Sequence, residues 1–135
     1  MEKQKYMEKQ RFYYDKGVLG SKSGRPIRIL SEYLSPLSSF NHNKVESTVV
    51  FFGSARIKNN EDSSINKYYK KAQNLAYLIT KWNMQNFEGK RYVITSGAGP
   101  GIMEAANRGA AEAKGKTVGL GTSLPFEQTN NKWIT

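Results

Sequence analysis

A glycine-rich turn at residues 96–101 constrains the fold of this sequence more than any other feature. It reads Ser96-Gly97-Ala98-Gly99-Pro100-Gly101 and follows the short apolar run Tyr92-Val93-Ile94. After the turn, small residues recur at helical spacing through Ala113, which predicts a helix whose narrow face can approach a sheet closely. Pro100 suits the first position of that helix. The turn therefore joins a predicted strand to a predicted helix.

The same alternation continues on both sides of the turn. Residues Val49 to Phe52 form an apolar run that stops at Gly53, which predicts a first strand buried on both faces. Residues 117–120 predict a third strand, and residues 121–135 predict a loop without a further element. The order strand, helix, strand, helix, strand predicts an α/β fold with a parallel sheet and right-handed crossovers, the first half of a doubly wound fold.

The helix between the first two strands is predicted at residues 64–84, with Ser63 or Ser64 as its cap. Its apolar residues recur at helical spacing, and we expect that stripe to face the core. The stripe consists of Ile65, Tyr68, Ala72, Leu75, Ile79 and Trp82.

The first 47 residues lack this alternation. Residues 1–24 are polar and rich in glycine and serine toward their end, which predicts a disordered or frayed segment. Residues 25–47 predict a short packing helix followed by a linker. Ile27, Leu30 and Leu34 lie on one side of this helix, and Pro36 is expected to end it. Residues 48–135 form the third part, the α/β segment.

Composition excludes several classes of function. The chain has no cysteine and one histidine, so thiolate zinc sites, disulfides and histidine metal clusters are not expected. The start of the chain has no apolar leader and no run is long enough to span a membrane, so we expect a cytoplasmic protein without membrane partners. The net charge of +10 is dispersed, which favours a solvated basic surface over a nucleic-acid arm but would attract phosphate-bearing ligands.

The turn itself has the physical properties of a phosphate-binding loop. Its glycines let the backbone turn sharply, and the N–H groups at the start of the following helix point outward. The spacing G-x-G-x-G places Ile102 where the dinucleotide fingerprint has its third glycine, and the lysine of a P-loop is absent. A purely structural strand-to-helix turn remains the alternative interpretation.

Two other loops are expected at the same carboxyl edge of the sheet. Residues Gly53-Ser54-Ala55-Arg56 supply a hydroxyl and a guanidinium suited to a ribose or phosphate oxygen. Glu127 follows the third strand, where its carboxylate could accept hydrogen bonds from ribose hydroxyls or a base. Arg56 as a surface charge and Glu127 as a solvent-exposed carboxylate are the alternatives. For Glu104, in the first turn of the second helix, we favour a capping and dipole role.

The segment from Ser96 to Ala110, SGAGPGIMEAANRGA, resembles the first signature of the Lonely guy family, formerly labelled lysine decarboxylase-like. The segments GSAR at residues 53–56 and LPFEQ at residues 124–128 match neighbouring segments of that family, and RILSEY at residues 28–33 resembles the lead-in of its longer bacterial members. The similarity covers residues 25–131, and a match of fifteen residues is more specific than a glycine pattern.

The resemblance implies a Rossmann-like, usually dimeric protein that needs no cofactor or metal. Its implied activity is hydrolysis of the N-glycosidic bond of nucleoside 5′-monophosphates, either AMP or a cytokinin riboside monophosphate, to a free base and ribose 5-phosphate. Glu127 would match the family's substrate-contacting glutamate. The candidate substrate-binding residues are Gly53, Ser54, Arg56, Ser96, Gly97, Gly99, Gly101, Met103 and Glu127.

Two departures from the family pattern matter. Ala98 stands where the family usually has glycine, which would crowd the loop if that position needs a positive φ. The second signature, Pro-Gly-Gly-x-Gly-Thr-x-x-Glu with the preceding Arg-Lys pair, does not occur in residues 1–135. The resemblance implies that those residues hold the phosphate and supply the catalytic carboxylate and arginine, so we expect the catalytic residues beyond Thr135 and an inactive 135-residue chain.

Two other hypotheses remain. A non-catalytic nucleotide- or cofactor-binding module would bind AMP without turnover. A basic nucleic-acid-binding protein would bind DNA or RNA with a steep salt dependence, and the dispersion of the basic residues disfavours it.

Overall fold

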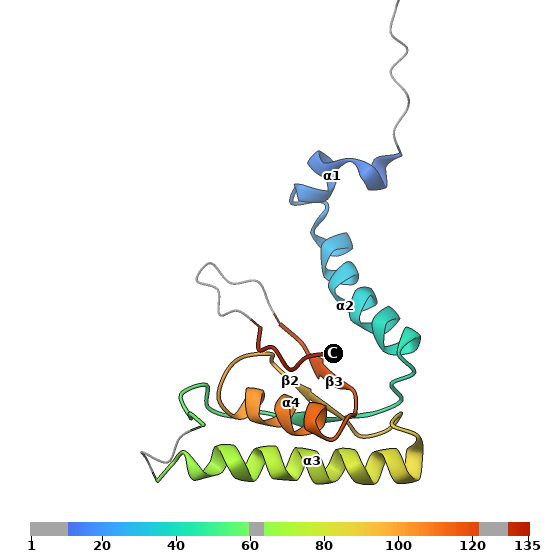
Figure 1. Ribbon diagram of the computed structural model, residues 1–135. Helices are drawn as coiled ribbons and strands as arrows, with labels where there is room; N and C mark the ends of the chain where they lie inside the picture. The colour runs from blue at the N-terminus through green and yellow to red at the C-terminus, as the bar shows by residue number, and fades with distance from the viewer. Residues whose placement is uncertain (1–10, 60–63, 122–129) are drawn as a thin grey trace, which may run out of the picture. The chain divides into compact units, whose positions relative to one another are not determined.

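The structure is a computed structural model that describes residues 11–59, 64–121 and 130–135, and it divides into two compact units, Met1–Asn43 and Lys44–Thr135. The first unit contains the short 3-10 helix η1 (Phe12–Tyr14), the helix α1 (Lys16–Gly20) and the long helix α2 (Arg25–His42) (Figure 1). Asp15 caps α1, because its carboxylate accepts hydrogen bonds from the N–H groups of Gly17 and Val18 at 2.8 and 3.2 Å.

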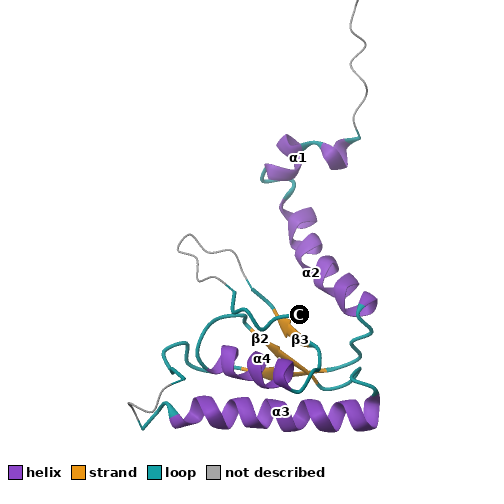
Figure 2. Ribbon diagram, in the orientation of Figure 1, coloured by secondary structure: helices purple, strands orange, loops and turns teal. Residues whose placement is uncertain are grey.

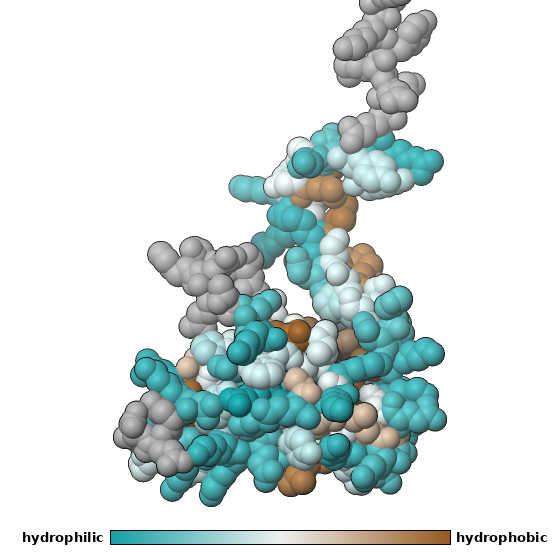
Figure 3. All heavy atoms as spheres, in the orientation of Figure 1, coloured by the Kyte–Doolittle hydropathy of each residue, from teal (hydrophilic) through white to brown (hydrophobic). Residues whose placement is uncertain are grey.

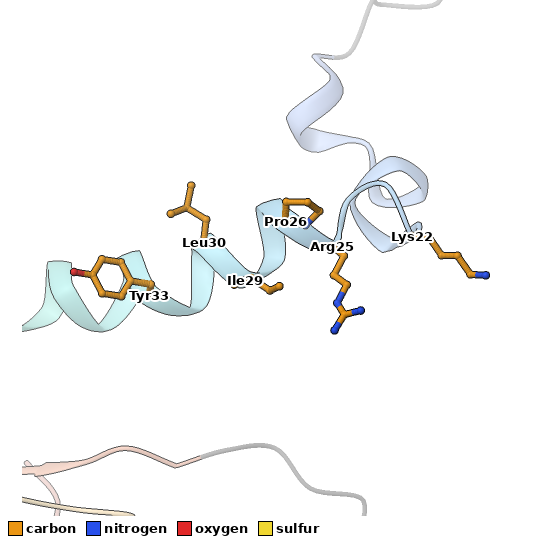
Figure 4. A pocket seen from close by; sticks show the side chains of 6 residues that line it. All are labelled: Lys22, Arg25, Pro26, Ile29, Leu30 and Tyr33. Atoms are coloured by element: carbon orange, nitrogen blue, oxygen red, sulfur yellow. The ribbon is translucent and has the colours of Figure 1, made fainter.

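The prediction that Pro36 ends the lead-in helix is wrong, because α2 continues to His42 with Pro36 inside it. Proline removes one N–H donor from the helix, but the apolar spacing runs on beyond it to Leu37 and Phe40. Within the first unit, no residue of α2 is buried. Figure 3 shows apolar side chains at its surface, and Figure 4 shows its first turns, where Pro26, Ile29, Leu30 and Tyr33 line a shallow groove with Lys22 and Arg25.

The second unit confirms the predicted α/β alternation. Its elements are β1 (Thr48–Phe51), α3 (Lys67–Phe87), β2 (Val93–Ser96), α4 (Ile102–Glu112) and β3 (Thr117–Gly119). The strands form a parallel sheet in the order β1-β2-β3, with Thr48 opposite Val93 and Ile94 opposite Thr117. This is an incomplete Rossmann-like sheet with flanking helices, as expected.

Both helices of the second unit lie on the same face of the sheet. The chain steps from β1 to β2 to β3 in one direction, so two right-handed crossovers place α3 and α4 on one side. Figure 2 shows the two helices running side by side next to the strands. The prediction that the first strand is buried on both faces is therefore wrong: Val50 is 49% exposed, and Phe52 lies just after β1 and is 85% exposed.

The predicted core-facing stripe of α3 is correct at Ile79, which packs against the core, but wrong for most of its large side chains. The buried residues of this helix are Tyr69, Ala76, Thr80 and Asn83, whereas Ile65, Tyr68, Leu75 and Trp82 are about half exposed. The buried face is smaller because α4 presents glycine and alanine and approaches closely: a Cβ on Gly109 would lie 2.0 Å from the carbonyl oxygen of Gln73. The N-cap of α3 is Asn66 rather than Ser63 or Ser64, and Ser63 lies outside the described residues.

The small-residue face of α4 completes the core as predicted. Ala106 and Ala110 are fully buried with Ala76 and Ile94 in one apolar cluster. The helix starts at Ile102 with Gly101 as N-cap, so Pro100 precedes the helix instead of occupying its first position, and Glu104 lies in the first turn without a side-chain cap bond at this end. Among the described helices, none combines the length and apolar character that a membrane span requires.

Candidate nucleotide site

The loop after β1 and the glycine-rich loop after β2 touch each other at the carboxyl edge of the sheet. The N–H group of Ile102 donates a hydrogen bond to the carbonyl oxygen of Ser54 at 3.2 Å. Gly101 adopts φ 74°, and a Cβ there would lie 2.2 Å from the same oxygen. Glycine at position 101 is therefore what permits this contact between the two loops.

The loop after β1 is exposed and internally ordered. Gly53, Ser54 and Arg56 are all exposed, and the Ser54 hydroxyl accepts a hydrogen bond from the N–H group of Arg56 at 3.1 Å. A Cβ on Gly53 would lie 2.5 Å from the side chain of Ile102, so glycine here keeps the loop against the start of α4. The guanidinium and the hydroxyl that the sequence predicted as ligands are thus available at this edge.

The glycine-rich loop does have a positive φ at position 98, the condition under which alanine was expected to crowd it. Ala98 has φ 65° and is 1% exposed, so a non-glycine residue occupies the left-handed region inside the loop. Gly97 is exposed, and a Cβ there would lie 3.1 Å from the sulfur of the half-buried Met103. Met103 thus packs under the loop.

Five N–H groups at this site have no acceptor among the described residues: those of Gly97, Gly99, Gly101, Met103 and Glu104, in the loop and in the first turn of α4. Gly97 is exposed, Gly99 and Gly101 are buried, and Met103 and Glu104 are half-buried. The helix dipole adds partial positive charge at the same place. Such N–H groups are the donors that an anionic ligand needs.

Ser96 has a different position from the other candidates. It is 2% exposed, and its hydroxyl donates to Oδ1 of Asn107 at 2.5 Å and accepts from the N–H group of Ala98 at 3.1 Å. Its hydrogen bonds therefore shape the loop from inside. Glu127 lies outside the described residues.

A buried polar network under the loop was missed by the sequence analysis. Asn107 is fully buried in α4, and its amide donates to the hydroxyl of Thr117 at 2.5 Å and to the carbonyl oxygen of Val118 at 3.2 Å. Its Oδ1 accepts from Ser96 and from the amide of Asn131. The available signal was a single asparagine among the small residues of the predicted core-facing helix.

Some charged groups of the second unit form ion pairs with each other. The Arg108 guanidinium bonds Glu112 at 2.8 Å and holds the pKa of that carboxyl below its ordinary value, while burial raises the pKa of Tyr69. Arg91 pairs with Glu46 at 2.7 Å, and Lys90 pairs with Glu88. Within residues 11–59, 64–121 and 130–135, no three side chains of the metal-binding types cluster together.

Comparisons with known proteins give a matching family and related solved structures. The SLOG cluster4 family matches residues 46–134. The X-ray structure of TM1055, a target of the Northeast Structural Genomics Consortium, is 22% identical with a TM-score of 0.44, and the similarity covers 66% of this chain and 43% of that one. This chain therefore aligns with less than half of the length of that protein. A search of curated proteins finds no match.

Proposed function

Since the chain belongs to the SLOG cluster4 family, within the LOG-like superfamily, we propose that its glycine-rich loop binds the 5′-phosphate of a nucleoside monophosphate. The activity we propose for the complete site is hydrolysis of the N-glycosidic bond of AMP or a cytokinin riboside monophosphate. In that reaction this chain supplies the glycine-rich loop and the loop that carries Arg56, and the resemblance assigns further phosphate contacts to the second signature.

The observation that carries the proposal is the group of unbonded N–H donors next to the exposed loop that carries Arg56. The N–H groups of Gly99, Gly101 and Met103 have no acceptor among the described residues, and the Ile102–Ser54 hydrogen bond fixes the loop that carries Arg56 next to them. A phosphate at this place would receive backbone hydrogen bonds and face the guanidinium. The dispersed charge of +10 would favour the approach of such an anion.

Cleavage of the glycosidic bond requires groups beyond a phosphate anchor. The departing base leaves an oxocarbenium-like ribose, which an anionic carboxylate stabilises and which water then attacks. The resemblance assigns that carboxylate and its arginine to the second signature, which residues 1–135 do not contain. We therefore propose that the 135-residue chain binds the nucleotide without turnover, as a homodimer.

Calorimetric titration with AMP and with adenosine tests the phosphate anchor directly. AMP should bind and adenosine should bind at least about tenfold more weakly, because charge-assisted hydrogen bonds contribute roughly 1.5–3 kcal/mol. Arg56→Gln should weaken AMP binding by about tenfold. Lys58→Gln removes the same charge from an exposed position two residues away and should leave the affinity unchanged.

Equal affinity for AMP and adenosine would contradict the proposal, and so would equal effects of the two variants. Base release, followed by chromatography, should stay at background for AMP and for isopentenyladenosine monophosphate. Robust release by the chain alone would show that the catalytic residues lie within residues 1–135.

A further inference from the structure

The side-chain amide of Asn131 donates hydrogen bonds to carbonyl oxygens of the glycine-rich loop. Its Nδ2 donates to the carbonyl oxygens of Ala98 at 3.1 Å and Gly99 at 3.2 Å, and its backbone N–H donates to Ala98 at 2.8 Å. The third acceptor of the same amide is Oδ1 of Asn107 at 3.0 Å. One side chain thus contacts two consecutive peptide groups of the loop.

These bonds determine the direction in which the loop presents its donors. The described residues contain no cis peptide bond, and in a trans peptide the C=O and N–H groups point in opposite directions. Because the carbonyl of Ala98 points toward Asn131, the N–H group of Gly99 points away from it. That N–H group is one of the donors without an acceptor among the described residues.

The support beneath Asn131 is rigid. Its partner Asn107 is fully buried and bonded to Ser96 at the end of β2 and to Thr117 and Val118 in β3. The Oδ1 atom of Asn131 also accepts the N–H group of Trp133 at 3.2 Å. Asn131 therefore connects the loop by hydrogen bonds to a network anchored in the sheet and in α4.

We propose that Asn131 is a positioning residue for phosphate binding, which holds the Ala98–Gly99 and Gly99–Pro100 peptides so that the N–H group of Gly99 faces the anion. This inference rests on the proposed function of the loop. It assigns a role to a residue that lies thirty residues beyond the loop in sequence.

Replacement of Asn131 should increase the number of conformations of the glycine-rich loop. It should therefore lower the affinity for AMP without removing a direct contact with the nucleotide. In Asn131→Ala, the binding-competent loop becomes one of several conformations, and the apparent affinity falls in proportion to its population. We expect the dissociation constant for AMP to rise about tenfold, as it would if the competent population fell to about one tenth.

Thr135→Val is the matched control. Thr135 anchors the same C-terminal segment, through its N–H bond to the carbonyl oxygen of Thr117 at 3.2 Å and its hydroxyl bond from the N–H group of Thr117 at 3.0 Å. Both variants should lower the melting temperature, but only Asn131→Ala should change AMP affinity and the NMR shifts of Ala98 and Gly99. Equal effects of both variants on affinity, at equal loss of stability, would overturn the proposal.

Two measurements on the unsubstituted chain keep the test decisive if Asn131→Ala does not fold or if AMP does not bind. The side-chain amide protons of Asn131 should exchange slowly with solvent, because they are bonded to oxygens of the loop and of Asn107. The loop should show high order parameters in relaxation experiments. Failure of AMP to bind with these signatures present would refute the proposed function alone, whereas fast exchange at the Asn131 amide would refute the positioning role.

Discussion

At the scale of single residues, the φ angle of Ala98 decides whether alanine can replace the family's glycine without strain. The sequence marked Ala98 as a departure that would matter only if its φ is positive, and the structure gives φ 65° with the side chain 1% exposed. An L-residue in the left-handed region costs about 1–2 kcal/mol relative to the right-handed one. The loop therefore carries a local strain that glycine would relieve.

Ala98→Gly should raise the free energy of unfolding by about 0.5–1 kcal/mol, since the relieved strain exceeds the entropy that glycine adds to the unfolded chain. Urea denaturation followed by circular dichroism measures this change. Ala106→Gly is the control, because Ala106 is a fully buried helical residue and its replacement should destabilise by about 1 kcal/mol or more. Loss of stability in Ala98→Gly comparable to that in the control would contradict this account.

The candidate site could be predicted in part from the sequence. Gly53, Ser54, Arg56, Gly97 and Gly101 lie where the loop pattern placed them, because parallel strands bring their carboxyl ends to one edge. Whether they bind a nucleotide stays a prediction. Asn131 could not be found, since its role depends on hydrogen bonds to a loop far away in sequence, which no local pattern encodes.

At the scale of elements, the helices and strands of the α/β segment follow from periodicity, but the buried face of α3 does not. The pattern favoured the large side chains of Leu75 and Trp82 as core, and both are about half exposed. The face that packs instead contains Ala76 and Thr80, because the partner helix α4 carries glycine and alanine. Tertiary packing of small residues thus outweighed hydropathy in choosing the buried face.

Gly109→Ala tests this close packing of α3 against α4. The added Cβ would lie 2.0 Å from the carbonyl oxygen of Gln73, so the helices must separate, and we expect a loss of about 1–3 kcal/mol in the free energy of unfolding. Gly20→Ala is the control, because a Cβ there meets nothing within 4 Å, and it should change stability by about 0.5 kcal/mol at most. Chemical denaturation measures both variants, and equal small effects would show that the helix contact is not close in solution.

At the scale of the whole molecule, the sheet of the second unit has two unlike edges. The N–H group of Val93 donates to Ser47, so in β1 the backbone groups of Thr48 and Val50 point to the other side. No strand among the described residues pairs with that side of β1, whereas at the opposite edge Thr117 bonds Thr135. An apolar edge strand with unpaired backbone groups favours association.

We therefore expect the 135-residue chain to associate with itself as concentration rises, consistent with the proposed homodimer. Val50→Lys places a charge on this edge and should weaken association by about tenfold or more. Asn59→Lys adds the same charge at an exposed loop position and should leave association unchanged. Sedimentation velocity over a range of concentrations measures both, and a strictly monomeric unsubstituted chain would contradict the expectation.

The most direct test of the central claim, that the glycine-rich loop binds a nucleoside 5′-phosphate, is a residue-resolved NMR titration of the ¹⁵N-labelled chain with AMP. We expect saturable shifts of the amide signals of Gly99, Gly101 and Met103 and of the neighbouring Arg56, reproduced by ribose 5-phosphate and absent with adenosine. Saturable AMP-induced shifts confined to other parts of the chain, or no shifts at millimolar AMP, would contradict it.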